Sequence, residues 1–332
     1  AAQNEKLYHG TNAALVAEDP KTGQILAMVG SRNYFDVKNE GNFNVATQGL
    51  RQPGSSLKPF IYLLAFQKGY APQTALFDVP TEFSTDSSCP PVPDFTNINK
   101  TCFHPQNFEG TFIGPVSMRN ALAQSINIPA VKTLYLVGWN TAVVEMNTFG
   151  LTTLVDPGAY GLSLTLGGGA VRLIDLMKAY STLAADGVKH DQVMVLSVQD
   201  ANGNTLESYN DRNAQVSDPQ SVRLVNNILS DASARSGLFQ NSLSLTVFPG
   251  HDVALKTGTS NDYRDAWTMG YTPSLVVGVW AGNNDNSPMQ RSGSSILAAV
   301  PIWSAFMSQA LQTAPTEAFP TPDPVSPLKP FL

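Results

Sequence analysis

Short apolar runs of strand length lie at both ends of this chain and enclose a long helical middle. Near the start, residues 14–17 and 25–29 flank Asp19-Pro20-Lys21-Thr22-Gly23, a segment with the composition of a turn. Strand-like runs return late in the chain, at residues 253–255, 266–271 and 275–280. Strands from both ends can pair in one sheet only if the helical middle leaves that sheet and returns. The order therefore predicts a mixed α/β body with an inserted helical lobe and a cleft between them.

Apolar residues recur at helical spacing through the middle of the chain and again near its end. The predicted helices cover residues 60–66, 117–123, 128–137, 141–149, 173–185, 221–234 and 296–311. Residues 31–54 are predicted as a long polar loop, and residues 78–114 as an irregular excursion rich in Pro, Ser, Thr and Asn. A second hairpin is predicted from residues 194–198 and 205–207.

The C-terminal residues differ in composition from the rest. Residues 313–332 contain six prolines, which is typical of extended, flexible segments. We therefore predict one domain over residues 7–312, followed by a flexible, Pro-rich tail over residues 313–332.

The composition excludes several classes of protein. Hydrophobic residues make up 42% of the 332 positions and charged residues only 14%, which indicates a compact chain with a neutral polar surface. The net charge of −6, without a long basic run, offers no surface for phosphates, so we expect no nucleic-acid partner. No run approaches the ~20 apolar residues needed to span a bilayer. Any export signal or anchor is expected outside this sequence.

Two cysteines, Cys89 and Cys102, lie thirteen positions apart in the 78–114 excursion. They could form a disulfide in an oxidising compartment, remain free thiols, or join nearby His104 in a metal site. The disulfide is the favoured alternative and the metal site the least favoured.

Three short motifs with chemically active residues follow one another along the chain. They are S-x-x-K at Ser55 and Lys58, S-x-N at Ser125 and Asn127, and K-T-G-T at Lys256, Thr257, Gly258 and Thr259. Each alone is weak, because a second K-T-G occurs at residues 21–23 and a second S-x-N at residues 31–33. The early K-T-G lies in the predicted hairpin turn, where its lysine is solvated. The late one ends an apolar strand whose edge could receive a ligand.

Pro59 places the first motif at the start of a helix. Proline is tolerated in the first helical turn but costs ~3 kcal/mol farther in, so the helix is predicted to begin within about a residue of Ser55. Ser55 then lies at the positive end of the helix dipole, with Lys58 on the same face. A lysine acts as a base only when neutral, and lowering its pKa from ~10.4 to near 7 needs roughly 4 to 5 kcal/mol. Burial and a second cation, Lys256, are the effects able to supply this.

Each motif also has an ordinary structural explanation. Ser55 could cap a helix, Ser125 and Asn127 could be caps between two helices, and Lys256 could end a strand before a turn. The three motifs together, in this order, favour a catalytic site with Ser55 as the candidate nucleophile over three unrelated structural features.

The residues around the motifs resemble the transpeptidase domain of class A (bifunctional) penicillin-binding proteins. The similar segments are residues 51–60, 121–127, 255–262, 265–267 and 270–273, with Leu166-Gly167-Gly168-Gly169 as a further landmark. The resemblance extends from about residue 7 to about residue 311. It implies an α/β fold of the penicillin-binding protein and serine β-lactamase type, in which an antiparallel sheet is flanked by helices and carries an inserted helical lobe.

The resemblance also implies a reaction: a serine D,D-transpeptidase that cross-links peptidoglycan stem peptides and is acylated by β-lactam antibiotics. Ser55 would attack the carbonyl between two D-alanines, and Lys58 would accept its proton. Ser125 would relay a proton to the leaving group, while Asn127 would orient Lys58 and a substrate amide. No metal or organic cofactor is implied.

The third motif has roles in binding under the same resemblance. Lys256 would add positive potential, Thr257 and Thr259 would contact the substrate end, and Gly258 would let the peptide lie along the strand. The backbone N–H groups of Ser55 and Thr259 would form an oxyanion hole.

Several alternatives share parts of this chemistry. A D,D-carboxypeptidase or a β-lactamase would release the acyl group to water. A class A β-lactamase needs a Glu to activate that water, and residues 156–169 contain none. A non-catalytic sensor would bind β-lactams or wall peptides without turnover. Members of the family that this sequence resembles carry a membrane anchor and a glycosyltransferase domain before this region. We therefore expect an excised fragment of an extracytoplasmic protein, periplasmic or on the outer face of the cytoplasmic membrane, with a naturally monofunctional enzyme as the alternative.

Overall fold

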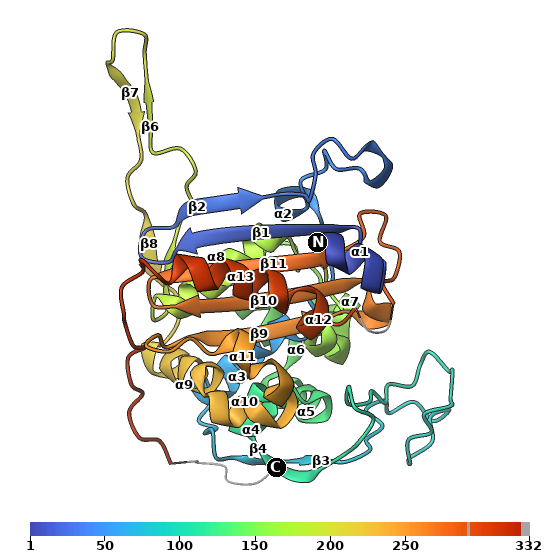
Figure 1. Cartoon of the computed structure of the whole chain (residues 1–332). Coiled ribbons are helices and arrows are strands. Elements are labelled where there is room, and N and C mark those ends of the chain that lie inside the picture. Colours follow the sequence, from blue (N-terminus) through green and yellow to red (C-terminus); the bar gives the residue numbers. More distant parts are fainter. Residues whose placement is uncertain (291–292, 327–332) are drawn as a thin grey trace.

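The computed structural model describes residues 1–290 and 293–326 of the chain. At its centre is a five-stranded antiparallel sheet in the order β2-β1-β11-β10-β9 (Figure 1). The strands are β1 (Asn12–Asp19), β2 (Gln24–Val29), β9 (Ala254–Thr259), β10 (Asp265–Thr272) and β11 (Leu275–Gly282). Strands from both ends of the chain share one sheet, which confirms the prediction from the order of the apolar runs.

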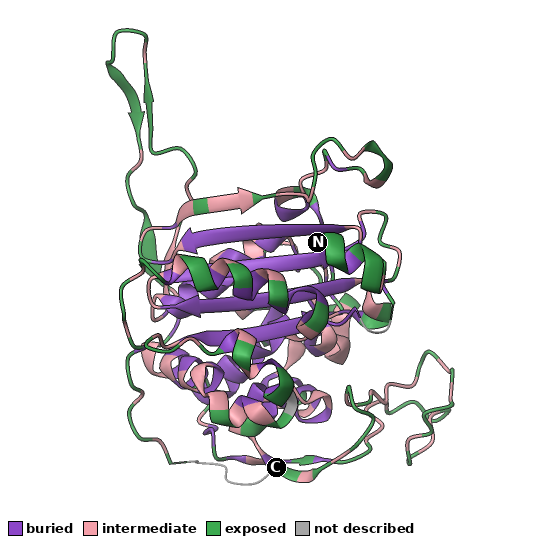
Figure 2. Ribbon diagram, viewed as in Figure 1, coloured by how far each residue is buried: buried purple, intermediate pink, exposed green. Residues whose placement is uncertain are grey.

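Helices cover both faces of this sheet, so successive strand residues pack into different layers. On β1, Ala14 and Val16 join the larger core under the helical lobe, whereas Leu15 joins a smaller core under α13 (Val300–Ala310). The strands β10 and β11 are buried along their whole length (Figure 2). Burial on both faces explains why these strands are almost continuously apolar in the sequence.

The inserted lobe lies between β2 and β9 and is built around one helix, α3 (Lys58–Gln67), which is buried from Lys58 to Phe66. The longer helices around it are α4 (Met118–Ala123), α5 (Asn127–Val137), α6 (Trp139–Thr148), α8 (Leu173–Ala184), α9 (Pro219–Ser230) and α10 (Ala232–Phe239). Shorter elements are α1 (Ala2–Tyr8), α2 (Val45–Gln48), α7 (Pro157–Tyr160), α11 (Leu243–Thr246) and the pair β5 (Val188–His190) and β8 (Asn213–Gln215).

Two helices predicted as continuous are each divided in two, which corrects the sequence prediction. Residues 221–234 fall on α9 and α10, because Asp231 ends the first and its side chain accepts a hydrogen bond from the Ala234 N–H to cap the second. The C-terminal helix is divided into α12 (Ser295–Ala298) and α13, whose first turn contains Pro301. A proline there cannot continue the preceding helix.

The irregular excursion is confirmed over residues 79–113, between the paired strands β3 (Ala75–Asp78) and β4 (Gly114–Ser117). Cys89 and Cys102 form a disulfide with a Cα–Cα distance of 5.4 Å, which confirms the favoured alternative. His104 is paired instead with Glu82, at 2.7 Å. The metal-site alternative is wrong, since both sulfurs belong to the disulfide.

The second predicted hairpin is confirmed as β6 (Ser197–Gln199) and β7 (Thr205–Ser208), which project from the body (Figure 1). After α13 the chain runs as an extended segment, described as far as residue 326, along the ends of the strands and past α9 (Figure 1). The predicted tail also includes residues 327–332, which lie outside the described residues. No helix in the described part of the chain is long and apolar enough to cross a bilayer.

Candidate active site

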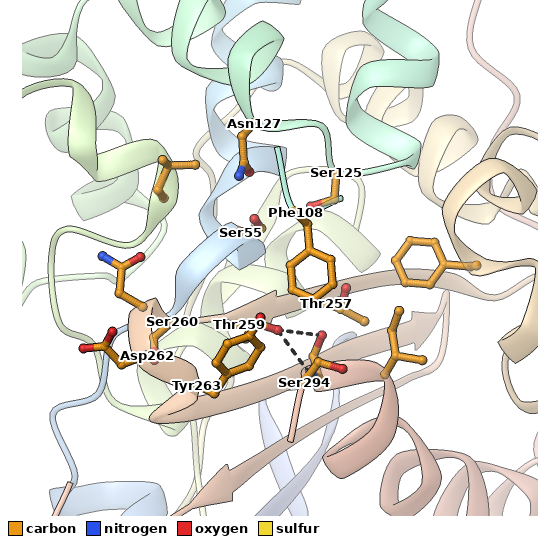
Figure 3. Close-up of a pocket in the computed structure, with 15 residues that line it drawn as sticks. Ser55, Phe108, Ser125, Asn127, Thr257, Thr259, Ser260, Asp262, Tyr263 and Ser294 are labelled. Carbon is orange, nitrogen blue, oxygen red and sulfur yellow. Dashed lines mark hydrogen bonds between the residues drawn. The ribbon is translucent and has the colours of Figure 1, made fainter. Parts of the chain in front are cut away.

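A cavity of about 240 Å³ opens where the sheet meets the helical lobe (Figure 3). Five of the eight predicted site residues line it: Ser55, Ser125, Asn127, Thr257 and Thr259. The other three, Lys58, Lys256 and Gly258, are buried next to these residues. Three segments that are far apart in the sequence therefore meet at one cavity.

The segment Pro53–Leu57, here called the nucleophile turn, delivers Ser55. Gly54–Leu57 form a 3-10 turn that leads into α3 at Lys58, and Pro59 lies in the first turn of α3. Helical backbone thus begins next to Ser55, as Pro59 predicts, although the α-helix itself starts three residues later. The Trp267 indole N–H donates to the Gln52 carbonyl at 2.8 Å, and the Ser56 hydroxyl donates to the Pro53 carbonyl at 2.6 Å. Among the described residues, none accepts or donates a hydrogen bond at Ser55 Oγ, so this hydroxyl is free to react.

Gly258 brings β9 close to the nucleophile turn. A Cβ at this position would overlap the Pro53 carbonyl oxygen and approach the Ser56 nitrogen to 3.0 Å. The sequence prediction assigned this glycine to the substrate, but the structure gives a packing reason: its absent side chain leaves room for the nucleophile turn. Gly54 (φ +54°) and Gly167 (φ +90°) likewise touch backbone, the first at Thr259 and the second at Gly54.

Lys58 is fully buried, with its ammonium group turned toward the α4–α5 junction. Nζ donates to the carbonyl oxygens of Ser125 (2.7 Å) and Ile126 (3.2 Å) and to Asn127 Oδ1 (2.8 Å). These acceptors favour the charged form. Burial and the charge of Lys256 act in the opposite direction and hold the pKa of Lys58 well below its usual value.

Ser125 lies between the two lysines. It has left-handed backbone geometry (φ +59°), which costs a non-glycine residue about 1 kcal/mol and is often found at functional sites. Lys256 Nζ donates to Ser125 Oγ at 2.7 Å and to the Thr257 carbonyl at 2.8 Å. Burial lowers the pKa of Lys256 to about 7. Because Ser125 Oγ accepts from Lys256, its own hydrogen is free to point into the cavity.

The sequence prediction missed the residues that hold this arrangement from outside the motifs. Asn107, in the excursion, accepts from the Asn127 N–H at 3.0 Å through Oδ1 and donates to both Asp78 carboxylate oxygens. The Thr259 hydroxyl donates to Ser295 Oγ at 3.0 Å. Neither Asn107 nor Ser295 lies in a periodic pattern or a known motif, so only their neighbours in space reveal them.

Further lining residues also lie outside the three predicted motifs: Phe108, Leu166, Phe239, Ser260, Asn261, Asp262, Tyr263, Ser294, Ser295 and Ile296. Phe108 and Tyr263 meet edge to face with ring centroids 6.3 Å apart. Among the described lining residues, Asp262 supplies the one carboxylate. The cavity thus exposes a free serine hydroxyl and a second serine, and two buried lysines lie next to them, a set that suits acyl transfer to a serine.

The chain was compared with known proteins. Residues 13–307 match the family model described as penicillin binding protein transpeptidase domain. Penicillin-binding protein 2D of Bacillus subtilis is 33% identical over 320 residues, covering 93% of this chain and 42% of the relative. Penicillin-binding protein 1A of Neisseria lactamica is 32% identical, covering 98% and 38%. This chain therefore spans about two fifths of the length of these curated relatives.

Solved structures agree with the fold. Penicillin-binding protein 1A from Haemophilus influenzae superposes with a TM-score of 0.81 at 24% identity, covering 97% of this chain and 51% of that one. The PonA1 protein from Mycobacterium tuberculosis in complex with penicillin V gives 0.79 at 25% identity, covering 98% and 84%. The resemblance predicted from the sequence and the predicted fold class are both confirmed. By the family match and the similarity to these relatives, this chain belongs to the family of penicillin-binding protein transpeptidase domains, enzymes of the serine acyltransferase kind.

Proposed function

We propose that this domain is a D,D-transpeptidase that cross-links peptidoglycan stem peptides through an acyl-enzyme on Ser55. The observation that carries the proposal is the convergence of Lys58, Ser125 and Lys256 on a cavity that exposes the Ser55 hydroxyl. The lowered pKa of Lys58 increases its neutral fraction, which is the form able to accept a proton.

In the first half-reaction, Ser55 Oγ attacks the carbonyl carbon between two D-alanines while Lys58 takes the hydroxyl proton. The backbone N–H groups of Ser55 and Thr259 stabilise the oxyanion, each by roughly 3 kcal/mol. The C–N bond then breaks, and Ser125 passes its proton to the leaving D-alanine amine while it regains one from Lys256, which donates to Ser125 Oγ. Thr257 and Thr259 contact the terminal carboxylate beside the positive charge of Lys256, and Asn127 orients Lys58 and a substrate amide.

In the second half-reaction, the amine of another stem peptide attacks the Ser55 ester and forms the cross-link. The attacking amine loses its proton through Ser125 to Lys256, and Ser55 recovers the proton held by Lys58 as the ester bond breaks. We place this reaction outside the cytoplasm, where stem peptides and β-lactams are found and where the Cys89–Cys102 disulfide is stable. We also predict an anchoring segment and a glycosyltransferase domain outside this sequence.

Two alternatives differ from the transpeptidase in the step after acylation or binding. In a D,D-carboxypeptidase, water would resolve the ester, and in a sensor no peptide would turn over. Fast hydrolysis needs a base placed to activate water. Asp262 is the one lining carboxylate among the described residues, and it lies 3.6 Å from Arg264. This pairing favours the transpeptidase.

The test is time-resolved intact mass spectrometry with benzylpenicillin. We expect wild type to gain the full mass of the antibiotic and to keep it for many minutes, and Ser55→Ala to gain nothing. An adduct on Ser55→Ala would contradict the nucleophile assignment, and release within seconds would indicate a β-lactamase. Incubation with a stem pentapeptide and an amine acceptor then separates the alternatives: a cross-linked product indicates the transpeptidase, free tetrapeptide the carboxypeptidase, and no product the sensor.

A further inference from the structure

A column of aromatic rings links the C-terminal segment to α3, the helix that follows the nucleophile turn. Phe319 meets Tyr271 at a centroid distance of 5.5 Å, Tyr271 meets Tyr180 at 5.9 Å, and Tyr180 meets Phe60 of α3 at 5.5 Å. All three contacts are edge to face, with interplanar angles of 80°, 71° and 86°. This geometry is favourable between aromatic rings and makes each ring sensitive to the position of the next.

The Tyr180 end of the column reaches the nucleophile turn directly. The Tyr180 hydroxyl donates to the Ser56 carbonyl at 2.7 Å, and Tyr180 is fully buried on α8. Ser56 follows Ser55, and its carbonyl lies in the 3-10 turn that leads into α3. The buried Tyr180 side chain therefore holds the nucleophile turn in place through this hydrogen bond.

The middle of the column is fixed by its own hydrogen bonds. The Tyr271 hydroxyl donates to Asn226 Oδ1 at 2.7 Å, and Asn226 Nδ2 donates to the Leu183 carbonyl near the end of α8 at 2.8 Å. Tyr271 lies on β10 and Asn226 on α9. The ring that supports Tyr180 is thus held between the sheet and two helices of the lobe.

The outer end of the column is the C-terminal segment, residues 313–326, which the composition predicted as a flexible tail. Phe319 is only 8% exposed, and its N–H donates to Asp252 Oδ2 at 3.2 Å. Gln220 of α9 exchanges two hydrogen bonds of 2.9 Å with the Asp323 backbone. Prolines reduce the entropy lost when an extended segment is held in one conformation. The segment therefore has specific contacts that close the outer end of the column.

We propose that Tyr180 is a positioning residue for Ser55 and that the C-terminal segment, through Phe319 and Tyr271, supports it. None of these residues lines the catalytic cavity, so each acts through the nucleophile turn. The effect on acylation rests on the proposed function, but the effect on the nucleophile turn does not.

The test uses Tyr180→Phe, which removes one hydroxyl and keeps the ring, Phe319→Leu, which removes the aromatic contact, and the double variant. The acylation rate is measured against benzylpenicillin concentration. We expect Tyr180→Phe to lower the saturating rate by about 3- to 10-fold, the range for one lost hydrogen bond, with the half-saturating concentration unchanged. Phe319→Leu is expected to lower that rate by about 2- to 5-fold. The double variant should match Tyr180→Phe, because both changes act on the same contact.

Two matched controls accompany these variants. Tyr62→Phe removes a buried hydroxyl from α3 that makes no hydrogen bond to the nucleophile turn, and Glu317→Gln removes the ion pair of the C-terminal segment with Lys21. Both are expected to acylate at the wild-type rate. Equal losses in Tyr62→Phe and Tyr180→Phe, or additive losses in the double variant, would overturn the proposal.

Hydrogen exchange in the free protein decides the proposal without acylation. We expect Tyr180→Phe and Phe319→Leu to speed exchange in the peptide covering residues 51–60 and the controls to leave it unchanged. Unchanged exchange in the two test variants would overturn the proposal even if wild type is acylated. If wild type is not acylated, the proposed function fails. Faster exchange in the two test variants then still supports the proposal that Tyr180 and Phe319 hold the nucleophile turn.

Discussion

The tripeptide Lys-Thr-Gly occurs twice in this chain, and the two copies lie in opposite environments. The first, residues 21–23, lies at the turn between β1 and β2. The Lys21 side chain is 53% exposed and pairs with Glu317 at 2.8 Å. Gly23 adopts φ +73°, which a turn of this kind requires. This copy provides a solvated cation and a turn.

The second copy, residues 256–258, lies within β9 beside β10. Lys256 is 2% exposed and donates to Ser125 Oγ, which belongs to a segment 131 positions away. Gly258 has no special backbone conformation but accommodates the nucleophile turn. The comparison shows that segments distant in the sequence determine how each lysine is solvated. They exclude water from Lys256, whereas Lys21 stays in contact with water.

The largest difference in acylation rate is expected between the variants Lys256→Ala and Lys21→Ala. Lys256→Ala removes the cation beside Ser125 and should abolish labelling by fluorescent penicillin. We expect a rate loss of at least about 10⁴-fold, the order seen when a member of a serine triad is removed. Lys21→Ala removes only an exposed ion pair and should label as wild type does. Equal loss in both variants would show that the wrong K-T-G has been assigned to the site.

The pH dependence of stability should also separate the two lysines. The folded-state pKa of Lys256, about 7, lies below the ordinary value of 10.5. Between these values the unfolded chain binds more protons, so the free energy of unfolding rises with pH. From pH 7 to 9 this group alone contributes a rise of about 2 to 3 kcal/mol. The lowered pKa of Lys58 adds to the rise with the same sign.

Urea unfolding at pH 7, 8 and 9 measures this rise. Lys256→Met should flatten it, both by removing one titrating group and by removing the charge that lowers the pKa of Lys58. Lys21→Met is the matched control and should keep the wild-type slope. Measurements start at pH 7 because Glu18, whose pKa burial raises to about 7, gives the opposite slope below that pH. Parallel slopes in wild type and Lys256→Met would contradict the burial of this lysine.

The smallest effects on stability and acylation are expected from substituting the glycines of the two copies, Gly23 and Gly258. Gly23→Ala places a Cβ in left-handed backbone next to the Asp191 carbonyl and should lower the free energy of unfolding by about 1 to 2 kcal/mol. Gly258→Ala should cost a similar amount, because the new methyl group overlaps the Pro53 carbonyl. Only Gly258→Ala should slow acylation, by about tenfold, since it displaces the nucleophile turn. Slower acylation in Gly23→Ala would remove the distinction between the two copies.

Much of the fold was predictable because its signals are local. The apolar runs of β1, β2, β9, β10 and β11 and the periodicity of α3, α5 and α8 are set by which residues face the core. The breaks at Asp231 and before Pro301 were missed, because helical periodicity continues across both. Composition located the excursion between β3 and β4, but it did not predict that Asn107 of this excursion contacts the candidate site.

Within the candidate site, the sequence alone predicted which residues carry the chemistry and determined the order in which they occur. The proline ring of Pro59 restricts the backbone, so a helix must start next to Ser55. The three motifs can be identified without a structure. The two copies of K-T-G are identical as text, so context along the chain could only favour one of them. The tertiary structure decided between them, since burial and a partner for Lys256 arise only when β9 packs against the α4–α5 junction. The same holds for Asn107, Ser295 and Phe319: each acts through a contact with a distant segment, and such contacts leave no periodic or local signal in the sequence.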